Sequence, residues 1–116
     1  MYLNVKSSSG NTDEIGYWRK ANHIHTWFVE NIQAGVDDCR SYSVSQLQLK
    51  ELLELCKRVL AFKHLAHEQL PTQGGFFFGS TEYGEGYYAD IERTIEIISN
   101  ALEYPATSHI YYQSSW

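Results

Sequence analysis

The sequence predicts an α+β protein that is mainly helical, with three principal helices and a small β element formed by the two ends of the chain. Three segments carry apolar residues at the three- and four-residue spacing of an amphipathic helix. The two ends are instead rich in aromatic and β-branched residues. Because neither end can form a stable strand alone, we expect them to pair antiparallel on one face of a layer of three helices.

The first part of the chain is expected to form a short strand and then a long helix. Residues 2–6 alternate like an edge strand. Asn11 or Thr12 can cap a helix that runs from about residue 13 to residue 34 and stops at Gly35. The apolar stripe of this helix, which we assign to the core, consists of Tyr17, Ala21, Ile24, Phe28 and Ile32.

Two further helices follow. Ser43 or Ser45, each with a glutamine three residues later, can cap a second helix. This helix is expected to bend near His64 and to end at Leu70, because a proline follows and disfavours helical geometry before it. A third helix is expected from about residue 86. Its apolar residues are Tyr88, Ile91, Ile95, Ile98 and Leu102.

Length, charge and cysteine content limit the classes of function. A chain of 116 residues with 43% hydrophobic residues is expected to form a single domain, residues 1–116. The net charge of −5 argues against a nucleic-acid partner, because phosphate attraction supplies most of that affinity. No stretch of the sequence has the pattern of a membrane span or a signal peptide, so no membrane partner is expected. Cys39 and Cys56 favour two reduced thiols in a cytosolic protein, with one disulfide as the alternative.

The connection between the second and third helices is unusually long and rich in glycine and aromatic residues. It contains Phe76, Phe77, Phe78 and Tyr83 among four glycines, which let a backbone approach a ligand closely. Three adjacent Phe side chains cannot all enter one core from an irregular loop. We therefore expect at least one of them to line a cavity, a partner surface or a neighbouring subunit. The alternative is that these rings cover the core of a small domain.

The first predicted helix carries the strongest candidate for a binding site. Trp18, Asn22 and His25 would share one face, and Arg19 and His23 the next. A nucleotide-like ligand needs an aromatic plane for its base, cations for its phosphate and polar groups that read its edges. The alternative is a helix with a buried Trp18 and solvated polar residues. The candidate ligand-binding residues are Trp18, Arg19, Lys20, Asn22, His25, Phe76, Phe77, Phe78, Ser80 and Tyr83.

Neither a metal nor another cofactor is expected. His64 and His67 have a spacing that can bind a metal, but no third ligand completes a site. The known glycine-rich phosphate loops and the nucleophile-elbow motif are absent from the sequence. If the protein is an enzyme, we expect His25 to act as the base and Glu82 as the acid.

Four separated segments resemble a widespread family of small, uncharacterised phage and prophage proteins. These segments are YWRKANHIHTWF (17–28), GVDDC (35–39), LPTQGGFFFGSTEY (70–83) and YYQSSW (111–116), so the resemblance covers most of the chain. It implies that the protein acts in the cytoplasm of a bacterial host during infection or lysogeny. Small accessory phage proteins commonly counter host defences, and the resemblance extends that expectation to this chain.

Three hypotheses for the function follow. The first is a phage accessory protein that binds and sequesters a nucleotide-derived small molecule in a polar-aromatic pocket. The second is an inhibitor that docks its Phe-rich loop onto a host protein, since aromatic residues and arginine dominate such contacts. The third is a nucleotide-cleaving enzyme. All three are compatible with a homo-oligomer, because a small domain often completes its pocket across a symmetry axis.

Overall fold

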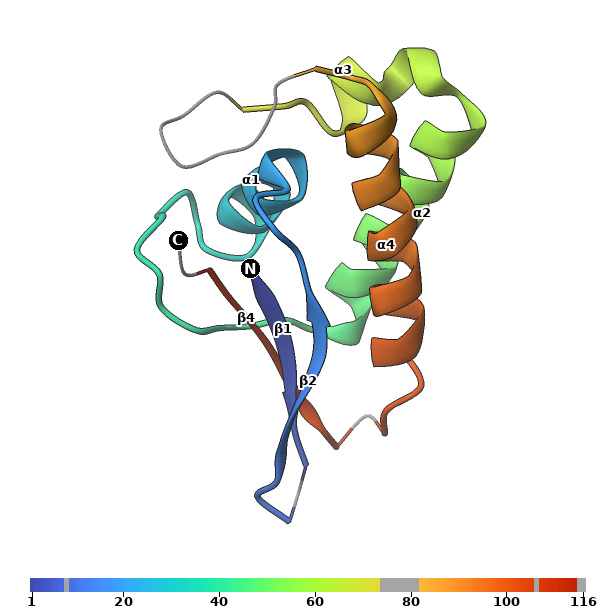
Figure 1. Ribbon diagram of the computed structural model, residues 1–116. Coiled ribbons are helices and arrows are strands. Elements are labelled where there is room, and N and C mark those ends of the chain that lie inside the picture. The colour runs from blue at the N-terminus through green and yellow to red at the C-terminus, as the bar shows by residue number, and fades with distance from the viewer. Residues whose placement is uncertain (8, 74–81, 106, 115–116) are drawn as a thin grey trace.

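The computed structural model describes residues 1–7, 9–73, 82–105 and 107–114, and these residues form an α+β structure (Figure 1). Helices and strands are both present, so the predicted α+β class is confirmed, whereas the three helices and the small terminal β element match only roughly. In chain order the elements are β1 (Tyr2–Lys6), β2 (Thr12–Tyr17), α1 (Asn22–Asn31), β3 (Tyr42–Ser43), α2 (Gln46–Ala61), the short 3₁₀ helix Lys63–Leu65, α3 (Ala66–Gln69), α4 (Glu85–Ala101) and β4 (His109–Gln113).

The sheet has the strand order β2-β1-β4-β3, and all neighbouring strands are antiparallel. The predicted pairing of the two chain ends is confirmed, because Tyr2 lies opposite Gln113 and Lys6 lies opposite His109. Figure 1 shows these two strands side by side. The sheet is nevertheless larger than predicted, since β2 and β3 extend it at either edge.

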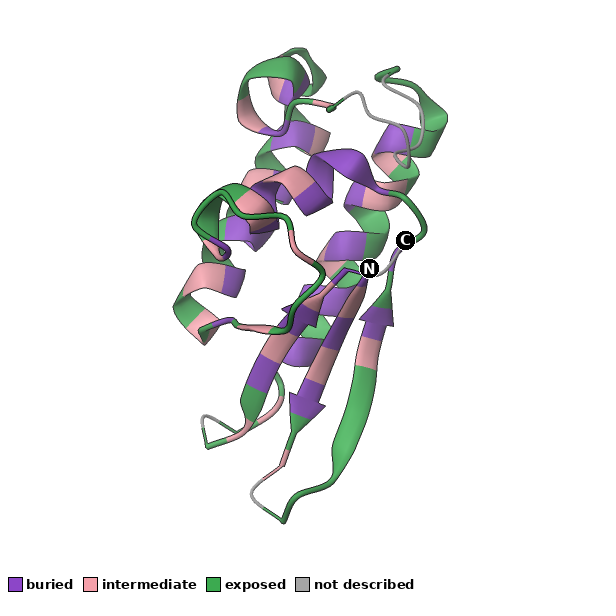
Figure 2. Ribbon diagram, turned by 90° about the vertical axis from the view of Figure 1, so that its left-hand side faces the viewer, coloured by how far each residue is buried: buried purple, intermediate pink, exposed green. Residues whose placement is uncertain are grey.

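The helices α2 and α4 pack against each other and cover one face of the sheet, while α1 lies near one end of β1 (Figure 1). Successive side chains of a strand point to opposite faces. Leu3 and Val5 of β1 are therefore buried against the helices, whereas their neighbours are more exposed (Figure 2). From β4, the ring of Tyr112 stacks on that of Phe28 with centroids 3.8 Å apart and joins α1 to this core.

The predicted first helix is wrong over its first part. Residues 12–17 form β2 instead, because they pair with β1 from Thr12 opposite Lys6 to Tyr17 opposite Tyr2. The chain then turns at Lys20, whose φ of 53° lies outside the helical region. The helix α1 begins only at Asn22 and already ends at Asn31. Its predicted apolar stripe does hold within these limits, since Ile24 and Phe28 are both buried.

The second helix begins as predicted and is divided near the predicted bend. The hydroxyl of Ser45 accepts a hydrogen bond from the Gln48 N–H at 3.0 Å, and the Gln48 side chain accepts one from the Ser45 N–H at 2.9 Å. This reciprocal arrangement satisfies two N–H groups at the start of α2. The helix ends at Ala61, and the segment predicted to continue it to Leu70 consists of the 3₁₀ helix and α3.

The third predicted helix is α4, which begins at Glu85, close to the predicted position. Ile91 and Ile98 are fully buried as expected, but Ile97 and Thr94 complete the buried face, and Ile95 is only partly buried.

Two further observations concern the described residues. The thiols of Cys39 and Cys56 are both free, so the disulfide alternative is wrong. None of the described helices combines the length and apolar character needed to cross a bilayer.

Candidate functional site

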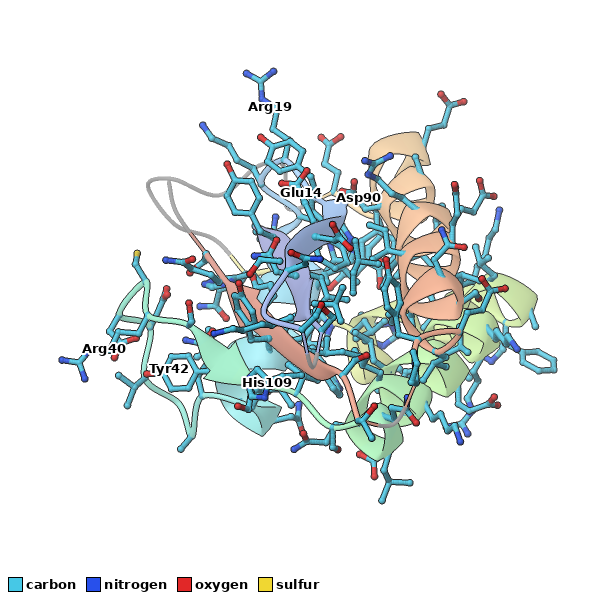
Figure 3. All side chains as sticks on the ribbon, turned by 90° about the horizontal axis from the view of Figure 1, so that it is seen from below. Glu14, Arg19, Arg40, Tyr42, Asp90 and His109 are labelled. Carbon is cyan, nitrogen blue, oxygen red and sulfur yellow. The ribbon has the colours of Figure 1, made fainter. Side chains whose placement is uncertain are left out.

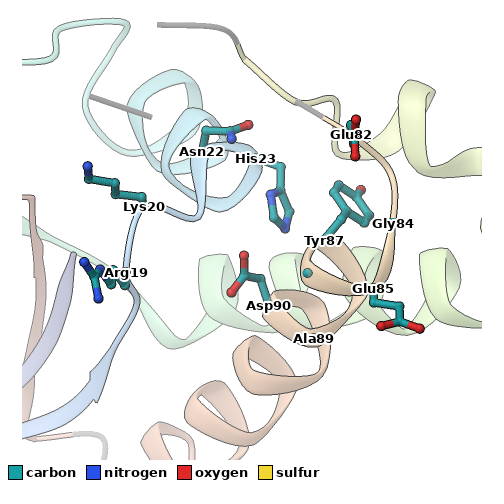
Figure 4. Close-up of a pocket in the computed structure, with 11 residues that line it drawn as sticks. Arg19, Lys20, Asn22, His23, Glu82, Gly84, Glu85, Tyr87, Ala89 and Asp90 are labelled. Carbon is teal, nitrogen blue, oxygen red and sulfur yellow. The ribbon is translucent and has the colours of Figure 1, made fainter. Parts of the chain in front are cut away.

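A cavity of about 470 Å³ lies between the turn that joins β2 to α1 and the N-terminal half of α4 (Figure 4). We call it the turn–helix cavity. Its volume falls in the range of small-molecule sites, roughly 300–1,000 Å³. The turn contributes Arg19 and Lys20, the start of α1 contributes Asn22 and His23, and the α4 side contributes its polar and aromatic groups. The latter are Glu82, Glu85, Tyr87 and Asp90.

The turn is held in place from two directions. The backbone N–H of Trp18 donates to the carbonyl oxygen of Met1 at 2.9 Å. The Arg93 side chain of α4 donates from Nε to the carbonyl oxygen of Tyr17 at 2.7 Å. These contacts hold both polar groups of the peptide bond that joins Tyr17, the last residue of β2, to Trp18. They leave the side chains of Arg19 and Lys20 exposed at the cavity, and Figure 3 shows Arg19 extending from the body of the molecule, far from Arg40.

The floor of the turn–helix cavity is a stacked pair of rings. The imidazole of His23 and the ring of Tyr87 have centroids 4.1 Å apart and an interplanar angle of 28°. Both side chains are buried, and the Tyr87 hydroxyl donates to the Leu70 carbonyl oxygen at 2.7 Å. Burial lowers the pKa of His23 to about 4, although the nearby Tyr87 backbone partly offsets this effect. The ring is therefore neutral at pH 7, and its Nε2 has no hydrogen-bond partner among the described residues.

Asp90 is the acidic group nearest the middle of the cavity. Figure 4 shows its carboxyl group pointing from α4 into the space that His23 also enters. Burial raises its pKa to about 6, and the charge of Arg93 opposes this shift. The carboxylate makes no hydrogen bond to another described residue. A half-buried carboxyl with a raised pKa is typical of functional sites, because only an ordered environment can hold it there.

Both flanks of the predicted aromatic loop are anchored beside the cavity. The Gln73 N–H donates to Oδ1 of Asn22 at 2.8 Å, and the Thr72 N–H donates to the hydroxyl oxygen of Tyr83 at 3.1 Å. Tyr83 is 40% exposed, and its ring centroid lies 5.1 Å from that of Tyr87. Glu82 and Gly84, on either side of Tyr83, line the cavity, whereas Tyr83 itself is not among the lining residues. The predicted site residues Phe76, Phe77, Phe78 and Ser80 lie outside the described residues.

Two predicted site residues lie away from this cavity. Trp18 is fully buried, and its Nε1–H donates to the Thr94 hydroxyl at 2.8 Å, so its indole belongs to the core and offers no face to a ligand. The expected helical face of Trp18, Asn22 and His25 is therefore wrong, since Trp18 precedes the helix. His25 is also buried and lines a separate cavity of about 350 Å³.

The separate position of His25 affects the predicted acid–base pair. Its two ring nitrogens contact the Tyr112 hydroxyl and the Asp37 carboxylate, at 2.6 Å and 3.0 Å respectively. Glu82 instead lines the turn–helix cavity. The two residues thus border different cavities and are not brought together as a base and an acid.

His23, Tyr87 and Asp90 were missing from the predicted ligand-binding set. They meet because β2 and α4 pack together and because the turn replaces the expected helix, two features that residue spacing does not reveal. Within the described part of the chain, no group of three or more His, Cys, Asp or Glu side chains is arranged to hold a metal ion. Comparison with family models, curated proteins and solved structures finds no match for this chain.

Proposed function

We propose that this protein binds and sequesters a nucleotide-derived small molecule in the turn–helix cavity. The observation that carries the proposal is the order of chemical groups along the cavity. Arg19 and Lys20 border one side of the cavity, and His23 and Asp90 lie nearer to α4 (Figure 4). The exposed ring of Tyr83 packs against Tyr87, next to the lining residues Glu82 and Gly84. A nucleotide presents phosphate, sugar and base in the same order.

The phosphate would bind at Arg19 and Lys20. Both side chains are exposed and border the cavity from the same turn, so neither must leave a buried partner to meet an anion. A guanidinium can donate two parallel hydrogen bonds to phosphate oxygens, and a lysine adds a compact charge.

The base would stack on Tyr83, whose neighbours Glu82 and Gly84 line the cavity. Its ring is supported from behind by Tyr87, and its exposed fraction leaves area for a planar ligand. The helix α4 begins beside this ring without a side-chain cap at Gly84. The first N–H groups of an α-helix have no partner within the helix, so this end of α4 adds donors that could meet acceptor atoms on a base edge.

Binding without turnover fits the described residues better than catalysis, because the expected acid and base border different cavities. The resemblance to small phage proteins adds a setting in which capture of a nucleotide signal would counter a host defence. The protein would then act in the bacterial cytoplasm.

Native mass spectrometry with a panel of cyclic and ADP-ribose-type nucleotides and adenosine 5′-monophosphate (AMP) tests this proposal. We expect an intact ligand adduct and an affinity at least about tenfold lower in the double variant Arg19→Gln/Lys20→Gln, the loss expected for charge-assisted hydrogen bonds. The variant Arg40→Gln/Lys57→Gln makes the same change of charge away from the cavity and should bind normally. A bare protein mass with every nucleotide would overturn the proposal, and a converted ligand would show an enzyme instead.

A further inference from the structure

A further cavity lies on the open face of the sheet, the face turned away from α2 and α4 (Figure 2). We call it the sheet-face pocket. Its volume is about 390 Å³, which falls in the range of small-molecule sites. It is lined by two basic residues, three residues with aliphatic hydroxyls and one tyrosine, namely Lys6, His109, Thr12, Ser41, Ser43 and Tyr111. None of these described lining residues carries a carboxyl group, although the chain has a net charge of −5.

The register of the strands brings these side chains together. Lys6 of β1 lies opposite both Thr12 of β2 and His109 of β4, and directly opposite residues of antiparallel strands share a face. Tyr111 follows two residues after His109, so it shares this face, and it lies opposite Ser43 of β3. The residues between them in β1 and β4 are buried on the other face. Each of the four strands therefore contributes a side chain to one pocket.

Lys6 supplies the positive charge of the sheet-face pocket. Its side chain is exposed and forms no ion pair with another described residue. Two acidic residues follow Thr12 in β2, but neither is among the described lining residues. Asp13 lies opposite the buried Val5 and so belongs to the other face of the sheet. Glu14 shares the face of Thr12 but lines a different cavity, beside the C-terminal end of α4. The charge of Lys6 is therefore available to an anionic ligand.

Hydroxyl groups supply further hydrogen-bond donors around Lys6. The Oγ atom of Ser43 lies 3.0 Å from Nε2 of His109. When the imidazole donates from Nε2 to this oxygen, the O–H of Ser43 is left to donate to a ligand. Thr12 and Ser41 add two hydroxyls, from the edge strand β2 and from the residue before β3. This set of donors favours a ligand with several acceptor atoms, because each hydroxyl can turn its proton toward an anion.

We infer that the sheet-face pocket binds a phosphate group, with Lys6 supplying the charge and the surrounding hydroxyls donating to the phosphate oxygens. A carboxylate offers two oxygens in one plane, whereas a phosphate offers oxygens in several directions and suits donors from several strands. Hydrogen bonds to its charged oxygens are also stronger than those between neutral groups. The ring of Tyr111 adds an apolar wall for the organic part of a phosphate ester. The pocket is separate from the turn–helix cavity, so the inference does not depend on the proposed function.

NMR titration of the isotope-labelled protein with inorganic phosphate and with phenyl phosphate, at constant ionic strength, tests this inference. We expect saturable shifts of the amide signals of Lys6, Thr12, Ser43 and His109. Lys6→Gln should weaken binding at least about fivefold, because a hydrogen bond to a charged group is lost. Lys57→Gln makes the same change of charge at an exposed position of α2 and should bind like the natural protein. Tighter binding of phenyl phosphate would assign the pocket to an ester, and equal binding would assign it to free phosphate.

The double variant Arg19→Gln/Lys20→Gln separates this pocket from the turn–helix cavity, because it should leave the shifts on the sheet face unchanged. Shifts that are confined to the turn and are lost in this double variant would overturn the inference. Shifts on the sheet face that do not saturate, or an affinity that is unchanged in Lys6→Gln, would overturn it as well. The titration of the natural protein requires no mutation, so its outcome does not depend on how well a variant folds.

Discussion

The hydroxyl oxygen of Tyr112 lies 2.6 Å from Nδ1 of His25, inside the core that joins the sheet to α1. On the other side of the same imidazole, Nε2 lies 3.0 Å from Oδ1 of Asp37. Burial lowers the pKa of His25, so the ring carries one proton at neutral pH. A carboxylate can only accept a hydrogen bond, so Nε2 donates to Asp37 and Nδ1 accepts from Tyr112. This network ties β4, α1 and the loop after α1 together.

The first prediction concerns this network. Tyr112→Phe removes the hydroxyl that contacts Nδ1 of His25. We expect the free energy of unfolding to fall by about 1–3 kcal/mol, the cost of losing a buried hydrogen bond. Urea denaturation measures this change. Tyr111→Phe, at the half-buried neighbouring position, removes the same atom and should have little effect. Equal stability of the two variants would contradict the network.

The second prediction concerns pH. The pKa of His23 falls from 6.5 to about 4, so the unfolded chain binds the extra proton between these values and stability decreases as pH falls through them. The pKa of Asp90 rises from 3.8 to about 6, so here the folded state binds the extra proton and stability decreases as pH rises through this window. The two effects oppose each other between about pH 4 and 6.

Asp90→Asn removes the contribution of Asp90 to the pH dependence of stability and leaves that of His23 unchanged. We expect the variant to be more stable than the natural protein at pH 7 by roughly 1–2 kcal/mol, after allowance for solvent screening. Near pH 3, where most of the natural Asp90 is protonated in both states, the difference should become small. Denaturation of both proteins across this pH range is the measurement, with Glu92→Gln as a control that should follow the natural protein. A variant that is less stable at pH 7 would show that the carboxylate supports the fold, contrary to the burial that raises its pKa.

The third prediction concerns the contact between β2 and α4. A Cβ atom on Gly16 would lie only 2.4–2.7 Å from three side-chain carbons of Ile97, which is itself buried. We expect Gly16→Ala to lower the free energy of unfolding by about 1–3 kcal/mol through overpacking. Adding Ile97→Val should recover part of the loss. Gly86→Ala meets no atom within 4 Å and should be neutral or stabilising in a helix. A harmless Gly16→Ala would mean that β2 packs less closely on α4.

Gly16 also explains why the first helix was placed wrongly. The apolar residues from Tyr17 to Ile32 have helical spacing, but a glycine in the interior of a helix is unfavourable. In the structure, Gly16 instead lets strand β2 approach Ile97 closely. The choice between helix and strand for residues 12–17 depends on β1 and α4, which are distant in the sequence. Local signals were sufficient elsewhere. The capping pair of Ser45 and Gln48 fixed the start of α2, and the β-prone chain ends paired as expected.

The candidate site was predictable only in part. Arg19, Lys20 and Asn22 do border one cavity, because they are close in sequence and flank a single turn. His23 and Asp90 are brought together by tertiary packing. Burial lowers the pKa of His23 and raises that of Asp90, and residue spacing in the sequence does not reveal this burial. Trp18 was misplaced for the same reason, since a tryptophan next to basic residues has the same sequence pattern whether it binds a ligand or fills a core.

The last prediction separates these two roles of Trp18. Trp18→Phe removes the hydrogen bond from Nε1 to the Thr94 hydroxyl and leaves unfilled volume in the core. We expect the free energy of unfolding to fall by about 1–3 kcal/mol, while the affinity for AMP stays within about twofold, because the indole does not line the cavity. Thr94→Val removes the same hydrogen bond from the other side and should reproduce the loss of stability with no loss of affinity. If Trp18→Phe instead weakens AMP binding tenfold in a protein that remains folded, while Thr94→Val does not, then the indole contacts the ligand and the site must extend beneath the turn.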